Sequence, residues 1–220
     1  MKHSFLFILF LTLLFPKAQS QGFHAGIIGG ATMTDVSGVD MTDSDNDFHK
    51  LGFSLGGLVN HKIGKSSLIQ MEIAYIQKGS SQPPDSTVSN NYYRLALNYI
   101  DVSLLYKHII KFNFRKKPVD KFGFEAGLTA GTLFKSSYSF KSVDNSPIVN
   151  KLDLELLAGL FYNFTPGFYM SFRYSNSIIH AIPHQSKDTP FNPLLTIQNG
   201  NNLVYQITFG FVINNEKNDN

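Results

Sequence analysis

Residues 203–213, LVYQITFGFVI, alternate between two kinds of side chain. In an extended strand successive side chains point to opposite faces, so each kind collects on its own face. The stretch therefore predicts a strand with one small or polar face. Its other face is apolar and aromatic, and consists of Leu203, Tyr205, Ile207, Phe209, Phe211 and Ile213.

The same alternation recurs along the chain and predicts an all-β protein of about eight strands. No segment after residue 20 is long and apolar enough for a transmembrane helix, which needs about 20 residues. A membrane role would therefore use strands. The seven earlier strands are expected at residues 22–33, 50–61, 67–78, 95–110, 121–135, 151–164 and 168–177.

The connections between these strands differ systematically in length. Polar connections at 34–47, 79–91, 136–150 and 178–202 are long, whereas those at 62–66, 111–121 and 165–167 are shorter. Outer-membrane barrels have an even strand number, short periplasmic turns and longer external loops. The sequence thus predicts a closed antiparallel up-and-down transmembrane β-barrel. The long last loop leaves ten strands open, although its prolines disfavour an extra hairpin.

The first 20 residues are typical of a secretory signal. Lys2 and His3 precede an apolar run, and Ala18-Gln19-Ser20 offers small residues at cleavage-site spacing. We expect export across the inner membrane, one mature domain at residues 21–220, and residence in the outer membrane of a Gram-negative cell. The chain has no Cys, and its formal charge of +3 gives no argument for nucleic acid.

Charged residues within the expected strands fall on the face opposite the apolar one. A lipid-facing Arg or Lys at the bilayer midplane costs about 2–4 kcal/mol, so this asymmetry suits a membrane barrel. An eight-stranded barrel has an interior just wide enough for side chains, and buried charges must be paired. We expect a structural network of lumen charges made of Glu72, Asp101, Lys107, Glu125, Glu155 and Arg173.

A soluble lipocalin-like barrel is the alternative, because face alternation alone does not say which face points inward. In such a barrel the apolar residues would line a ligand cavity and the charges would face water. The alternation of long and short connections and the aromatic last strand favour the membrane barrel over the soluble one.

Four short motifs resemble the PorT-like outer-membrane β-barrel family of Bacteroidetes. They are EIAYIQKG at 72–79, YIDVSLLYK at 99–107, FEAGLTAG at 124–131 and FRYS at 172–175. The resemblance spans nearly the whole mature chain. It implies an outer-membrane barrel, and the family's founding member supports secretion through the outer membrane.

No motif predicts a cofactor, a metal or a catalytic centre. Asp43, Asp45 and Asp47 begin like a calcium loop, but the Gly and Glu that it needs are missing. His180 and His184 are separated by Pro183, and no G-x-S-x-G motif occurs. We expect a non-catalytic structural or interaction role. An outer-membrane enzyme acting on lipid is the less favoured alternative.

The 111–121 connection is unusually basic for a periplasmic turn. Arg115, Lys116 and Lys117 follow one another in it. They predict a contact with anionic headgroups or with a periplasmic protein. The expected partners are therefore outer-membrane lipid and an envelope or secretion-machinery protein, bound by a monomeric barrel.

Overall fold

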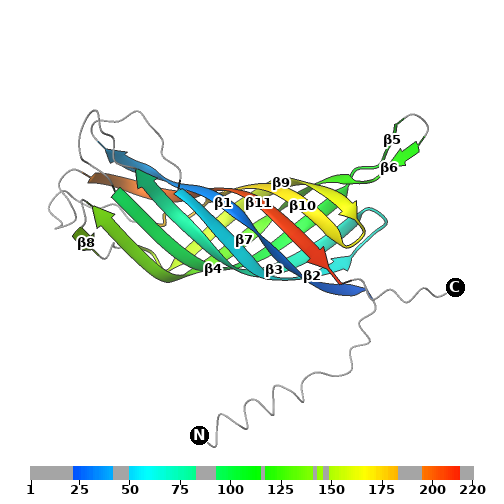
Figure 1. The fold of residues 1–220 in the computed structure, drawn as a ribbon, viewed down its shortest axis with the longest axis horizontal. Coiled ribbons are helices and arrows are strands. Elements are labelled where there is room, and N and C mark those ends of the chain that lie inside the picture. The colour runs from blue at the N-terminus through cyan, green and yellow to red at the C-terminus, as the bar shows by residue number, and fades with distance from the viewer. Residues whose placement is uncertain are drawn as a thin grey trace, which may run out of the picture.

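A computed structural model describes residues 22–41, 50–82, 93–114, 117–140, 143–145, 149–182 and 195–213 of the chain. These ranges form a β-barrel (Figure 1). They contain no helix long and apolar enough to cross a membrane. The expected signal at 1–20, Asp43, Asp45, Asp47, Arg115, Lys116 and His184 lie outside the described residues.

Eight strands close the barrel, each hydrogen-bonded to antiparallel neighbours. Sequential strands pair throughout, β4 pairs with β7, and β1 pairs with β11 to close the ring. The fold predicted from the sequence, an eight-stranded up-and-down barrel, is confirmed. The barrel strands are β1 (Phe23–Met41), β2 (Lys50–Lys62), β3 (Ser67–Gln82), β4 (Tyr93–Ile109), β7 (Phe122–Phe140), β9 (Leu152–Thr165), β10 (Phe168–Ser177) and β11 (Leu195–Val212).

Several strands are longer than their sequence pattern indicates. β1 continues to Met41, β3 to Gln82 and β7 to Phe140, and β11 begins at Leu195, so parts of all four expected long loops are strand. These extensions lie at the end of the barrel that carries the long loops. There the outer face no longer has to be apolar, and the alternation that marks a membrane strand fades.

Three short strands lie outside the ring. β5 (Phe112–Phe114) and β6 (Lys117–Val119) pair as a separate two-stranded sheet within the basic connection, which the sequence analysis interpreted as a periplasmic turn and to which it assigned no strand. This hairpin projects beyond the short-turn end of the barrel (Figure 1). β8 (Val143–Asn145) pairs with the end of β7 at the opposite, long-loop end.

The two faces of the barrel wall match the faces read from the sequence. On β9 and β4, Leu160 is 64% exposed on the outside, whereas Leu105 is fully buried inside. Large apolar side chains cover the exterior, which is the arrangement that lipid requires and water disfavours. The inverted, polar-outside lipocalin arrangement is therefore not the one adopted.

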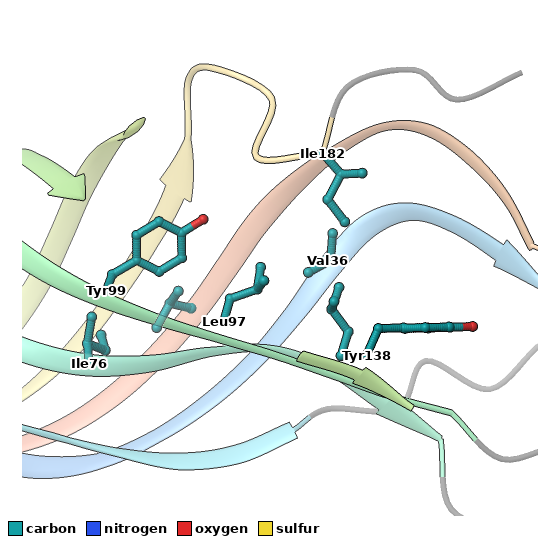
Figure 2. Close-up of a cluster of buried hydrophobic side chains, with 8 residues drawn as sticks. Val36, Ile76, Leu97, Tyr99, Tyr138 and Ile182 are labelled. Carbon is teal, nitrogen blue, oxygen red and sulfur yellow. The ribbon is translucent and has the colours of Figure 1, made fainter. Parts of the chain in front are cut away.

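Apolar side chains fill the lumen at the long-loop end. Figure 2 shows this cluster, which gathers residues from the strands and one from the last loop. Ile182 enters from that loop, is 1% exposed, and forms a bridge with Gly200 of β11. The buried members are Val36, Ile76, Leu95, Leu97, Tyr99, Tyr138, Ile182 and Val204.

Candidate functional site

Two groups of ion pairs occupy the middle of the lumen. They arise because inward positions on β3, β4, β7, β9 and β10 carry charged residues, and the strand register sets these residues side by side. The structure brings together all six residues of the expected lumen network, and adds Lys78 and Asp153 to them.

The first group, here the Arg173 cluster, consists of Arg173, Lys107, Glu72 and Glu125. The guanidinium donates to both oxygens of Glu72, at 2.8 and 2.7 Å, and to both oxygens of Glu125, at 2.7 and 3.3 Å. Lys107 Nζ lies 2.9 Å from Glu125, and Gln70 donates to Glu72 at 2.6 Å. Two cations face two carboxylates, and the planar guanidinium fork matches both of them.

Aromatic rings surround the ammonium of Lys107 on the side toward the short turns. Its Nζ lies 3.8 Å from the ring centroid of Tyr169 and 4.5 Å from that of Phe161. Each ring lies over a glycine of the neighbouring strand, Gly210 and Gly123 respectively, where a Cβ atom would overlap the ring. The rings hold the cation in place and narrow the lumen at this level.

The second group, here the Lys78 cluster, consists of Lys78, Asp101, Asp153 and Glu155. Lys78 Nζ lies 3.0 Å from Asp101, 3.2 Å from Asp153 and 2.6 Å from Glu155. One ammonium therefore faces three carboxylates, all with side chains at most 7% exposed. The backbone carbonyl of Lys78 accepts a hydrogen bond of 3.2 Å from Lys50.

Neutral hydrogen-bond donors stabilise carboxylates of the Lys78 cluster, which has only one cation for three of them. Ser175 donates to Glu155 at 2.9 Å, Ser177 donates to Asp153 at 2.6 Å, and Asn202 donates to Asp153 at 2.7 Å. Hydrogen bonds to a carboxylate stabilise its charged form in a low-dielectric interior. The inward position of Lys78 could be read from alternation, but these partners depend on the register of distant strands.

A small cavity separates the two clusters. Its volume is about 30 Å³, and Glu72 and Arg173 line it together with Asp101 and Glu155. A space of this size holds one or two water molecules and no larger ligand. Buried side chains of the two ion-pair clusters and of the apolar cluster at the long-loop end occupy the lumen of the described barrel.

The other residues singled out from the sequence lie apart from the lumen. His180 contacts Asn201 through Nδ1 at 2.8 Å and accepts from Asn150 through its carbonyl at 2.7 Å, at the long-loop end. Lys117 is part of β6, at the opposite end. The described ranges contain no group of three or more His, Cys, Asp or Glu side chains able to hold a metal ion.

Solved structures similar to this chain include outer-membrane proteins of other bacteria. Ail, the attachment invasion locus protein of Yersinia pestis, is 15% identical with a TM-score of 0.48, over 87% of this chain and 99% of that one. Neisserial surface protein A is 12% identical with a TM-score of 0.45, over 86% of this chain and 96% of that one. No match was found among curated proteins.

The family assignment rests on a sequence model. The model of the outer membrane protein beta-barrel domain matches residues 17–182, which is most of the chain. The closed eight-stranded ring and its apolar exterior agree with that match. This chain belongs to the outer membrane protein beta-barrel domain family, and its place is the outer membrane.

Proposed function

We propose that this protein is a non-catalytic outer-membrane barrel that acts through its ends, by binding other envelope components, and that it conducts nothing through its lumen. The observation that carries the proposal is the filled interior, with two ion-pair clusters and a cavity of about 30 Å³ between them. A hydrated ion or solute needs a continuous opening, and buried ion pairs are costly to open.

The short-turn end offers the clearest surface for a protein partner. The β5–β6 hairpin forms a sheet of its own and stands off the barrel (Figure 1). Isolated two-stranded hairpins are marginally stable in water, so a hairpin of this kind gains stability when it binds a partner. Lys111, Lys117 and Lys121 belong to this connection, together with Arg115 and Lys116. An acidic periplasmic protein complements it.

The role that follows is support of envelope biogenesis or of secretion, as in the PorT-like family that the sequence motifs resemble. The barrel anchors the hairpin at the periplasmic face of the outer membrane, and the hairpin recruits a soluble component of the machinery. The proposed role needs only a monomer, since the ring closes within one chain.

A hairpin exchange tests this role. Residues 111–121 are replaced by a Thr-Pro-Gly turn like the one at 165–167, and the variant is expressed in a strain that lacks the native protein. We expect normal membrane insertion, judged by a gel shift on boiling, together with loss of envelope integrity or of protein secretion.

Charge variants sharpen the test. Replacement of Arg115, Lys116 and Lys117 by Gln should reproduce part of the loss, whereas replacement of Lys135 and Lys151, exposed at the long-loop end, should have no effect. The proposal would be contradicted if the hairpin-exchange variant fully restored the strain that lacks the native protein and co-purified with the same proteins as the wild type.

A further inference from the structure

Three polar side chains meet on the outer face of the barrel, close to its short-turn end. Ser67 opens β3, His108 lies directly opposite it on β4, and Tyr106 precedes His108 on the same face. Ser67 Oγ lies 2.9 Å from Tyr106 Oη and 2.9 Å from His108 Nδ1, and the last two atoms are 3.3 Å apart. Most of the surface above them is apolar, so a polar group here has a specific reason.

This triangle retains capacity for another partner. Both of its contacts to His108 use Nδ1, so Nε2 of the ring has no hydrogen-bond partner within the residues that the structure describes. Tyr106 is 41% exposed, and His108 is partly exposed. The set can therefore donate outward to an acceptor that approaches from the membrane interface.

Aromatic rings form a platform beside the triangle. The Phe124 ring of β7 lies 5.4 Å from that of His108 and 6.4 Å from that of Tyr106. Ile69 and Leu104 continue the same face toward the middle of the barrel, and both are exposed. Aromatic residues take this level in membrane proteins, where acyl chains give way to headgroups.

Lysines lie on the periplasmic side of the triangle. Lys65 belongs to the β2–β3 turn and Lys111 follows β4, and Lys111 Nζ donates to the carbonyl of Lys65 at 3.3 Å. The amide of Ile109 donates to the carbonyl of Ser66 at 2.7 Å, which fixes the turn against the end of β4. Both lysines are exposed. Apolar surface, polar triangle and cations thus follow one another along the barrel axis.

We propose that this surface, Ser67, Tyr106, His108, Lys65 and Lys111, binds the phosphate of an anionic glycerophospholipid in the periplasmic leaflet. His108 Nδ1 accepts from a hydroxyl of the triangle, so its Nε2–H donates to a phosphate oxygen, and Lys65 and Lys111 place positive charge beside the phosphate. Ile69, Leu104 and Phe124 contact the acyl chains. A lipid is the occupant because the polar set continues directly into the lipid-covered face.

Along the barrel axis, the apolar, polar and cationic residues follow one another in the same order as the acyl chains, the phosphate and the headgroup of a phospholipid. Acyl chains meet apolar side chains, the glycerol and phosphate meet the triangle and its rings, and the headgroup side meets the lysines. Among the residues of the short-turn end whose side chains the structure describes outside the lumen, Lys62, Lys65, Lys111 and Lys121 are accompanied by one acid, Asp120. The charge of this end is therefore complementary to an anionic leaflet.

Native mass spectrometry of the full-length barrel in detergent tests the proposal. Palmitoyl-oleoyl phosphatidylglycerol is titrated against the protein, with palmitoyl-oleoyl phosphatidylcholine in parallel. We expect one phosphatidylglycerol to be retained preferentially. The pair Lys65→Gln and Lys111→Gln should weaken it by about fivefold for each lysine, and His108→Ala with Ser67→Ala should reduce it further.

The matched control is Lys135→Gln with Lys151→Gln, which removes two exposed lysines from the opposite end. A gel shift on boiling establishes that each variant is folded. Equal retention of the two lipids would overturn the proposal, and so would equal weakening by the control pair. Release of free fatty acid that requires Ser67 would also overturn it, by assigning the Ser67–His108 pair to hydrolysis.

Discussion

The two charge clusters of the lumen stabilise their buried carboxylates in different ways. In the Arg173 cluster two cations meet two carboxylates, and one guanidinium bonds both of them. In the Lys78 cluster a single ammonium serves three carboxylates, and hydroxyl and amide donors supply the remaining contacts. The Arg173 cluster has as many cations as carboxylates, whereas the Lys78 cluster has an excess of carboxylates that neutral donors stabilise. The free energy of unfolding should therefore change by different amounts when one member of each cluster is removed.

Removal of Lys78 should have the largest effect. In Lys78→Met the three carboxylates lose the cation that they share, and breaking a buried ion pair in this way costs about 3–5 kcal/mol. We expect a loss at the upper end of that range. The chain has no Trp, so urea unfolding in phosphatidylcholine vesicles is followed by circular dichroism and by the gel shift on boiling.

Removal of Arg173 should cost less than removal of Lys78. In Arg173→Met, Glu125 still forms its ion pair with Lys107, at 2.9 Å. Glu72 still accepts a hydrogen bond from the side-chain amide of Gln70, at 2.6 Å. We expect a loss of about 3 kcal/mol in the same urea titration. If Arg173→Met proved more damaging than Lys78→Met, then charge balance would not be what distinguishes the clusters.

Loss of one neutral donor should have an intermediate effect. Ser177 donates to Asp153 at 2.6 Å and accepts from the backbone N–H of Asn202 at 3.1 Å. Ser177→Ala should lower the free energy of unfolding by about 2 kcal/mol, as expected for a hydrogen bond to a buried charge. Ser37→Ala serves as the control, because its single bond to Asn201 is exposed. Equal effects of the two substitutions would contradict this assignment.

The smallest effect is expected at Asp101. Its Oδ1 has no hydrogen-bond partner among the described residues, while Oδ2 pairs with Lys78. Asp101→Asn removes one carboxylate from the cluster that has an excess of them, so stability should change by less than about 1 kcal/mol. Glu125→Gln, in the balanced cluster, should destabilise by more. The two variants are compared in one urea series, and the reverse ranking would refute the comparison.

The strand pattern, together with the alternation of long and short connections, was enough to predict the ring and its two faces. Side-chain alternation places Glu72, Glu125 and Arg173 on one face, and the connection lengths and the aromatic last strand indicate that this face points inward. It does not say which inward residues meet, since partners come from different strands and depend on register. Lys78 shows the limit: its inward position was readable, but its role as the shared cation was not.

Sequence reasoning also missed features at the two ends of the barrel. The extension of β1 to Met41 lies where lipid no longer selects apolar residues, so the polar stretch was interpreted as a loop. Ser67 and His108 are 41 residues apart in the chain and meet only through the pairing of β3 with β4. A local motif search has no signal for such a contact.

Conductance of the purified barrel in a planar lipid bilayer is the measurement closest to the central claim, that paired charges fill the lumen. Insertion is established first, by resistance to carbonate extraction and by the gel shift on boiling. The account predicts no steady channel current from inserted wild-type protein. A stable, reproducible single-channel conductance would contradict it and would indicate that the lumen charges line a pore.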